Sequence, residues 1–335
     1  METPIVPKLT WKEWKQALHG FYPGNPTFLE KDYPSLDGKV VIVTGGNTGV
    51  GYQVVKSLAG STNAKIYILS RNERKSMEAI TKMKLEIAEE YSKSVDQSIK
   101  LIQVDLSDLT TIKPAVDEFL HHEDRLDIII HNAGIMTPPI GTTTKQGYQL
   151  ELGTNNIGPQ LLQNLLDPIF IKTSETNKPN ESRIVWIAST SHLFSPLHGI
   201  NWKDPNYKET TGVPVKQTYS QSKAINIIQA QQWPIQHPQV KNAVSVSVCP
   251  GYLRTELQRN TSWLEKLGYS ALFYPPRLGA YTELFAALSP DVTTANNGQH
   301  IISFGQFGEI RNDLKDQDNS NKVWNYLQEQ ISQYL

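Results

Sequence analysis

Cysteine, long apolar runs and any excess of charge are all scarce in this sequence. Its one cysteine, Cys249, excludes an internal disulfide and a zinc-finger framework, and fits a reducing compartment, so a cytoplasmic location is expected. No stretch approaches the roughly 18 consecutive apolar residues that a membrane-spanning helix needs. Lys and Arg total 32 against 33 Asp and Glu, with no basic block, so we expect no nucleic-acid partner. The eight histidines show no convincing metal-ligand spacing, so no metal site is expected.

Short runs rich in Val and Ile alternate with helix-length amphipathic segments along the 335 residues. Continuous apolar strands separated by helices indicate a parallel sheet that is covered on both faces. The pattern predicts a single α/β domain over residues 38–335, with helices at 77–91 and 161–171 and surface loops at 173–182 and 196–217. The predicted strands are residues 39–44, 65–69, 99–104, 126–130, 184–188 and 244–248, with a weaker seventh at 299–303.

Residues 1–37 precede the first strand and predict a helical extension. Thr10 and Glu13 have the spacing of a capping box, which marks the start of a helix. Apolar stripes with helical spacing follow there and recur at the end of the chain: Trp11, Trp14, Leu18 and Phe21, then Trp324, Leu327, Ile331 and Leu335. Packing of both helices on the main domain is favoured. The alternative is contact of residues 10–21 with a partner or a lipid surface.

A glycine cluster follows the first predicted strand. The segment Thr44-Gly-Gly-Asn-Thr-Gly-Val-Gly51 joins that strand to a helical pattern. Glycine lets the backbone turn tightly and approach a pyrophosphate closely. The next helix then presents free N–H groups and its positive dipole end to the phosphates. An ordinary strand-to-helix turn would not require Gly45, Gly49 and Gly51 together, so the cluster predicts a dinucleotide site.

The spacing Thr-Gly-x-x-x-Gly-x-Gly resembles the cofactor motif of the short-chain dehydrogenase/reductase family. Further landmarks of that family follow in order over residues 36–303: Asp105-Leu106, Asn132-Ala133-Gly134, and Pro250-Gly251 with Thr255 four residues on. The resemblance implies a Rossmann-type, doubly wound fold with a seven-stranded parallel sheet. By the same resemblance, the cofactor contacts would also include Asn47, Thr48, Val50 and Leu253.

The end of the second strand predicts which cofactor binds. An enzyme that uses NAD usually places a carboxylate there for the ribose 2′-hydroxyl. This chain has Ser70 and Arg71 instead. A guanidinium attracts a 2′-phosphate and stacks on adenine, and the serine can donate a further hydrogen bond. NADP(H) is therefore expected, as in NADP-using relatives with Ser-Arg or Cys-Arg at this point.

Tyr219 and Lys223 lie four residues apart, so on a helix they share one face. They match the family's catalytic pair, in which the tyrosine exchanges a proton with the substrate oxygen. The lysine would lower the pKa of Tyr219 and bond the nicotinamide ribose. Ser189, at the end of the fifth strand, matches the catalytic serine that steadies the substrate oxygen. The segment Asn155-Asn-Ile-Gly158 resembles the family's Asn-x-x-Gly, and selects Asn155 over Asn156 to hold a relay water near Lys223.

Two departures from compact family members stand out. About 30 positions separate Ser189 from Tyr219, as in the retinol-dehydrogenase-like branch and related fungal reductases. Pro234 is predicted to stop the Tyr219 helix early. That helix often forms the family's dimer interface, so a monomer or dimer is expected in place of the usual tetramer.

The resemblance predicts an NADPH-dependent carbonyl reductase or alcohol dehydrogenase. Its substrate lid falls at about residues 252–275, where aromatic side chains gather: Trp263, Tyr269, Phe273 and Tyr274. A lipophilic ketone, aldehyde or alcohol would suit them, although they could equally pack the lid onto the body. The alternative class is a non-catalytic regulator that senses NADP(H), but degenerate relatives of that kind usually lose the tyrosine or the lysine.

Overall fold

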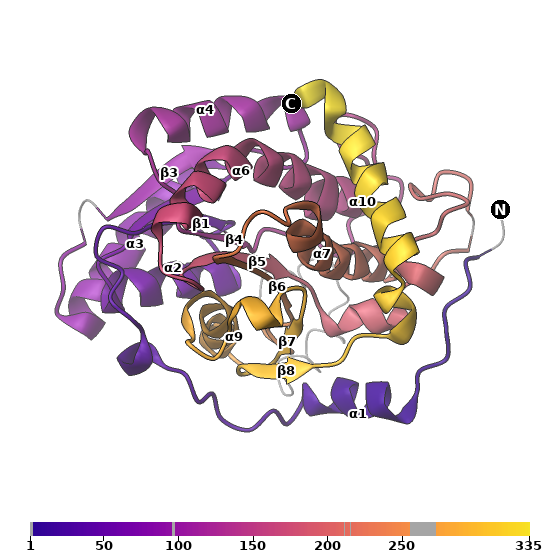
Figure 1. Ribbon diagram of the computed structural model, residues 1–335, viewed down its shortest axis with the longest axis horizontal. Coiled ribbons are helices and arrows are strands. Elements are labelled where there is room, and N and C mark those ends of the chain that lie inside the picture. Colours follow the sequence, from indigo (N-terminus) through magenta and orange to yellow (C-terminus); the bar gives the residue numbers. More distant parts are fainter. Residues whose placement is uncertain (1–2, 96–97, 211, 215, 255–272) are drawn as a thin grey trace.

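One mixed sheet forms the centre of the computed structural model, which describes residues 3–95, 98–210, 212–214, 216–254 and 273–335 (Figure 1). The strand order is β3-β2-β1-β4-β5-β6-β7-β8, and all neighbours run parallel except β7 and β8. The strands are β1 (Val40–Thr44), β2 (Lys65–Ser70), β3 (Ile99–Gln103), β4 (Ile128–His131), β5 (Ser182–Ile187), β6 (Ala243–Val248), β7 (His300–Ile302) and β8 (Gln306–Gly308). The seven predicted parallel strands are confirmed, and the fold is Rossmann-type.

The prediction of a purely parallel, seven-stranded sheet is wrong at one edge. β8 pairs antiparallel with β7, with Ile302 opposite Gln306. Phe304 and Gly305 turn the chain between the two strands, and both have positive φ, at 67° and 84°. A three-residue strand with one apolar side chain carries too little periodicity to be recognised in the sequence.

Helices cover both faces of the sheet (Figure 1). Val41 and Val43 of β1 pack on the side of α2 (Gly49–Ser61), α3 (Glu73–Tyr91) and α9 (Pro276–Leu288). Val40 and Ile42 face the side of α4 (Ile112–His122), α6 (Gly158–Thr176), α7 (Gln217–Gln236) and α10 (Gln317–Ile331). Both faces of each central strand are therefore buried, which explains why the apolar runs are continuous.

The helix that carries Tyr219 does not stop early at Pro234, contrary to the prediction. α7 continues through the proline to Gln236. Proline lacks the N–H that would bond the carbonyl of Ala230 four residues back. The hydroxyl of Ser245, on β6, donates to that carbonyl at 3.0 Å and replaces the missing bond. The argument from Pro234 against a helix-mediated oligomer therefore fails.

Both predicted terminal helices are present, but their apolar stripes face opposite ways. In α10, Trp324, Leu327 and Ile331 are buried, although Leu335 beyond it is exposed. α1 (Trp11–His19) begins with the predicted capping box of Thr10 and Glu13. It rests on the domain through Glu13 and Ala17, and the half-exposed Trp14 meets Phe194 edge-on with ring centres 6.4 Å apart, whereas Trp11 and Leu18 are 80% and 56% exposed.

The loops before α7 and before β5 also differ from expectation. Residues 177–181 form the short connection between α6 and β5. The predicted loop at 173–182 therefore begins too early and ends one residue too late. The segment after η4 (Thr190–Phe194) is a loop with exposed residues at Lys203, Lys208 and Glu209, as predicted, but part of it packs against α10. Trp202 contacts Tyr326 and donates from Nε1 to Asn319 at 2.9 Å.

Candidate active site

The sequence-predicted site residues that the structure describes meet at the carboxyl edge of the sheet. β1 leads into the glycine turn, β2 into Ser70-Arg71, β3 into Asp105-Leu106 and β4 into Asn132-Ala133-Gly134. Ser189 follows β5, and Pro250-Gly251 follows β6. The strand order reverses between β1 and β4, which is where open α/β sheets bind ligands. Thr255, Trp263 and Tyr269 lie outside the described residues.

The backbone conformation or close packing explains each predicted glycine of the turn. Gly45 and Gly49 have positive φ, at 66° and 59°, which favours glycine. A Cβ on Gly51 would lie 2.3 Å from Nδ2 of Asn132 and 2.7 Å from the Gly45 carbonyl oxygen. α2 begins at Gly49, and Thr48 precedes it without a side-chain cap, so Asn47, Thr48 and Val50 flank a bare helix N-terminus.

Asn132 ties the turn to β4. Its Nδ2 donates to the Thr44 carbonyl at 2.8 Å, and the Ala133 N–H donates to Oγ1 of Thr44 at 2.9 Å. A Cβ on Gly134 would lie 3.4 Å from Oδ1 of Asn155 and 3.6 Å from Nζ of Lys223. The Asn-Ala-Gly segment therefore lies between the glycine turn and the catalytic candidates.

Ser70 and Arg71 differ in their freedom to bind a ligand. The hydroxyl of Ser76 donates to the Asn72 carbonyl at 2.8 Å, so in its bond with Ser76 the Ser70 hydroxyl is the donor. Ser70 is buried and Arg71 is exposed at the end of β2. The donor role expected of Ser70 is therefore already used inside the chain, and Arg71 carries the argument for a 2′-phosphate.

Asp105 and Leu106 shape the next loop. The Asp105 carboxylate accepts from the N–H and the hydroxyl of Ser107, at 2.9 and 2.6 Å. The carbonyl of Leu106 approaches Gly158 so closely that a Cβ there would lie 2.3 Å away. The glycine of the Asn-x-x-Gly segment thus lets α6 begin directly beneath this loop.

Tyr219 and Ser189 come together from α7 and the end of β5. Tyr219 is 5% exposed, and its phenol lies close enough to the Ser189 side chain for the serine to lower its pKa. Oγ of Ser189 also accepts the Ser191 N–H at 3.2 Å. Since that N–H occupies a lone pair, the serine proton can point toward the tyrosine or a substrate oxygen. Two hydroxyls thus converge on one point, as reduction of a carbonyl requires.

Lys223 lies one turn after Tyr219, with Nζ 5.6 Å from the centre of its ring. Nζ donates to the Ile187 carbonyl at 2.6 Å and to Oδ1 of Asn226 at 3.3 Å. Burial lowers the pKa of Lys223 to about 8, and the nearby acidic groups Glu283, Cys249 and Glu151 only partly offset this. The ammonium is held at the point where β5 ends.

Burial also raises the pKa of Tyr219, and its hydrogen bond with Ser189 only partly offsets this. The net shift of the Tyr219 pKa is therefore upward, opposite to the direction expected from Lys223, because removing the phenol from water disfavours its anion. The lowering of this pKa by Lys223 itself stays a prediction. Tyr219 is accordingly a protonated donor at neutral pH, which suits reduction.

Asn155 lies in a single π-helical turn, Gly153–Ile157, between α5 (Leu150–Leu152) and α6. Its Oδ1 accepts the Ile135 N–H at 2.9 Å, and its Nδ2 donates to the Ile135 carbonyl and to Oγ of Ser222, both at 3.0 Å. The side chain therefore joins the loop after β4 to α7. Its main-chain carbonyl accepts Nδ2 of Asn226 at 2.8 Å.

An aromatic group borders the site on the side away from the glycine turn. Tyr252 follows Pro250-Gly251, lies close enough to the Thr190 side chain for that residue to lower its pKa, and donates from its hydroxyl to the Ala17 carbonyl of α1 at 3.3 Å. Phe21 stacks on Tyr252 with ring centres 4.3 Å apart, and Phe273 stacks on it at 5.5 Å. Leu253 is buried and forms a bridge with Tyr274. The N-terminal extension thus packs against the segment that follows β6.

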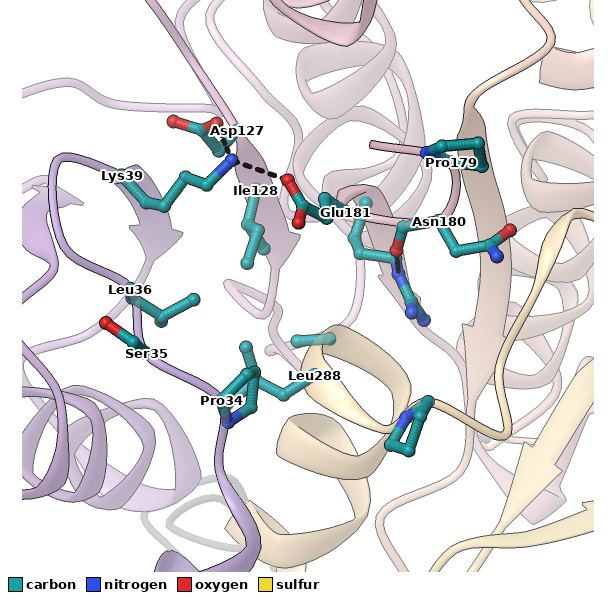
Figure 2. A pocket seen from close by; sticks show the side chains of 13 residues that line it. Pro34, Ser35, Leu36, Lys39, Asp127, Ile128, Pro179, Asn180, Glu181 and Leu288 are labelled. Carbon is teal, nitrogen blue, oxygen red and sulfur yellow. Dashed lines mark hydrogen bonds and ion pairs between the residues drawn. The ribbon is translucent and has the colours of Figure 1, made fainter. Parts of the chain in front are cut away.

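A cavity of about 260 Å³ lies at the other edge of the sheet, among the amino ends of β1, β4 and β5 (Figure 2). Its charged walls are already paired, since Nζ of Lys39 lies 3.4 Å from Asp127 and 2.8 Å from Glu181. None of the predicted site residues lines it.

Among the described residues, no cluster of His, Cys, Asp or Glu could hold a metal. The described helices include none long and apolar enough to cross a membrane.

Comparisons with known proteins agree with this geometry. The family model for short chain dehydrogenase matches residues 39–201. A short-chain dehydrogenase/reductase of Phomopsis amygdali is 36% identical over 96% of this chain and 98% of its own length. An uncharacterized oxidoreductase of Schizosaccharomyces pombe is 34% identical over 84% of this chain and 82% of its own length. The chain therefore belongs to the short-chain dehydrogenase family, and it is an oxidoreductase.

Solved structures show the same fold. An uncharacterized protein of Mycobacterium paratuberculosis aligns with a TM-score of 0.65 at 23% identity, covering 90% of this chain and 96% of that one. The NADPH-bound carbonyl reductase from chicken fatty liver aligns with a TM-score of 0.58 at 18% identity, covering 81% of this chain and 99% of that one.

A nicotinamide dinucleotide fits the residues at the carboxyl edge. The uncapped start of α2 leaves its N–H groups free for phosphates, and a Cβ on Gly51 would displace Asn132 or the Gly45 carbonyl, which shape the turn beside it. Sequence reasoning missed three neighbours of the site: Asn226, Thr190 and Tyr252. Asn226 could have been found from its place one turn after Lys223. The meeting of Thr190 and Tyr252 with the N-terminal extension carries no local signal.

Proposed function

We propose that this protein is an NADPH-dependent oxidoreductase that interconverts a lipophilic ketone or aldehyde and the corresponding alcohol. The observation that carries the proposal is the meeting of Ser189, Tyr219 and Lys223 beside the glycine turn. A regulator that only senses the cofactor would need the turn but not this group. The intact group therefore favours an enzyme.

The chain's own residues divide the work in reduction. A nicotinamide bound beside these residues would supply the hydride for the carbonyl carbon. Ser189 would donate a hydrogen bond to the substrate oxygen, and Tyr219 would give that oxygen its phenolic proton. Lys223, charged and 5.6 Å from the ring centre, would stabilise the phenolate that remains. Asn155 would keep the loop after β4 in register with α7 through its bonds to Ile135 and Ser222.

NADPH is proposed over NADH because of Arg71. An exposed guanidinium at the end of β2 can pair with a 2′-phosphate, and no carboxylate replaces Ser70 to repel it. The other proposed cofactor contacts are Gly45, Asn47, Thr48, Gly49, Val50, Gly51, Asp105, Leu106, Asn132, Ala133, Gly134, Pro250, Gly251 and Leu253. Thr255 would join them but lies outside the described residues.

Two measurements test this function. NADPH oxidation should be detectable at 340 nm with at least one member of a panel of aldehydes and ketones. NADPH should also bind at least tenfold more tightly than NADH, and Ser70→Asp with Arg71→Ala should erase or reverse that preference. Equal affinities for the two cofactors in the parent would contradict the assignment of NADPH, and failure of the whole panel would favour the regulator.

The lipophilic substrate is proposed from the aromatic border of Tyr252, Phe21 and Phe273. The panel should therefore show lower KM for longer or aromatic carbonyl compounds than for short ones. A KM that does not change with chain length would contradict this choice of substrate class.

The outward face of α1 supports a second, peripheral role. Trp11 and Leu18 are exposed beside Lys12 and Lys15, a combination that suits the surface of an anionic membrane. We propose that this face lies on such a surface next to the substrate side. The protein should sediment with vesicles of anionic phospholipid, and Trp11→Ser with Leu18→Ser should abolish this without changing the melting temperature. No sedimentation of the parent would contradict it.

A further inference from the structure

Lys223 has a side-chain partner that the sequence comparison did not select. Asn226 lies three residues further along α7 and is 3% exposed. Its Oδ1 accepts from Nζ of Lys223 at 3.3 Å, while its Nδ2 donates to the Asn155 carbonyl at 2.8 Å. A flipped amide would set an NH₂ group against an ammonium and an oxygen against a carbonyl. The contacts therefore fix which end faces the lysine.

A row of buried amides keeps Asn226 in this orientation. Nδ2 of Asn226 also donates to Oε1 of Gln229 at 3.1 Å, and Nε2 of Gln229 donates to Oε1 of Gln160 at 2.9 Å. Gln160 donates in turn to Asn164, and Asn164 donates to Gln328 on α10. From Asn226 to Gln160 the donors along the row point away from the active site, whereas at its far, half-buried end Asn164 and Gln328 donate to each other. Aligned hydrogen bonds polarise one another, so the oxygen at the head of the row, facing Lys223, gains negative character.

Asn155, in contrast, does not touch the lysine through its side chain. Its amide is used by Ile135 and Ser222, and its main-chain carbonyl accepts from Asn226. Asn226 thus stands between that carbonyl and Nζ of Lys223. The family resemblance assigns this connection to a relay water held by Asn155.

We propose that Asn226 is the positioning residue for Lys223, and that its amide takes the place of a relay water between the lysine and Asn155. This rests on the proposed function of Lys223. The ammonium has three N–H donors. Ile187 and Asn226 accept two of them among the described residues, which leaves the third for the nicotinamide ribose.

The charge of Lys223 provides a readout that a merely structural amide would not change. Burial lowers the pKa of Lys223 to about 8, and the ionisable groups that face it are Tyr219 on α7, Glu151 on α5, Glu283 on α9 and Cys249 after β6. An ammonium that bonds the nicotinamide ribose loses this role on deprotonation. The Kd for NADPH should therefore rise with pH, starting near the pKa of Lys223.

The experiment is titration of NADPH binding by fluorescence between pH 6.5 and 10, which needs no substrate. Asn226→Asp puts a carboxylate beside the ammonium and should move the bend in log Kd upward by about one pH unit. Asn226→Leu removes the acceptor and should move the bend downward, with about tenfold weaker binding at pH 7. Asn321→Asp, an amide on α10 bonded to Gln236 and Gln317, should keep the parental curve.

Melting temperatures of the variants show whether the fold is damaged. A damaged fold would also weaken NADPH binding equally at every pH, whereas the proposed effect moves the bend in log Kd. Parental bends in both Asn226 variants would overturn the proposal. A bend that persists in Lys223→Met would instead contradict the role of Lys223 in the proposed function, and would do so whatever Asn226 does.

Discussion

The cofactor half of the site and its substrate half are built in different ways. In the cofactor half, Gly45 and Asn132 come from turns that directly follow a strand, and Gly51 and Lys223 come from the helices α2 and α7. The substrate half joins Thr190 and Tyr252 to the N-terminal extension, through Phe21 and the Ala17 carbonyl. Short-range spacing therefore encodes the first half, and contacts between distant segments create the second.

The largest difference between the halves should come from Lys223→Ala. The substitution removes the ribose contact and the charge beside Tyr219, so NADPH affinity should fall at least tenfold and turnover about a thousandfold. Lys322, whose Nζ lies 4.1 Å over the ring of Trp202 far from the site, provides a matched control. Lys322→Ala should bind NADPH as the parent does. Equal losses in the two variants would mean that a general cation–π effect is being measured.

Acid should lower the stability of the folded protein, because each half of the site contains a buried neutral histidine. Burial lowers the pKa of His131 and of His192 to about 4. The unfolded chain binds these protons below about pH 6.5 and the folded chain does not, so stability is complete above pH 6.5 and falls as the pH drops toward 4. Each histidine should cost about 2 kcal/mol between pH 6.5 and 5.

Urea unfolding at pH 7.5 and pH 5 measures this loss. His131→Gln should show a smaller difference between the two pH values, because Gln gains no charge in the unfolded chain. His122→Gln, at an exposed position, should behave as the parent. Identical pH dependence in all three proteins would contradict the assignment.

Substitutions at two glycines, one in each half, should each affect one half of the site alone, with smaller changes in binding than Lys223→Ala. A Cβ on Gly51 would meet Asn132, and a Cβ on Gly20 would lie 2.6 Å from the Tyr252 ring. Each substitution by alanine should cost about 1–3 kcal/mol of stability by overpacking. Gly51→Ala should weaken NADPH binding, whereas Gly20→Ala should raise the KM for a lipophilic carbonyl compound and leave the Kd for NADPH unchanged. Parental KM in Gly20→Ala would show that the extension does not shape the substrate side.

The same division explains what could be predicted from the sequence. The seven parallel strands follow from continuous burial, and the glycine turn follows from its spacing, because both are local properties. Pro234 misled the prediction since the bond that compensates for it comes from Ser245, on another strand. The stripe on α1 indicated a helix but not its orientation, because helical periodicity does not state which face meets the domain. Asn226 was missed because its importance depends on the π-turn that brings the Asn155 carbonyl against it.

The central claim is that Tyr219 supplies the proton to the substrate oxygen. Its most direct test is a single-turnover measurement of NADPH oxidation in saturating cofactor, comparing the parent with Tyr219→Phe, which keeps the ring and removes only the hydroxyl. The chemical step should slow by at least about 100-fold, with NADPH binding nearly unchanged. A variant that reduces an active substrate at close to the parental rate would contradict the catalytic assignment, even though the glycine turn would still bind the cofactor.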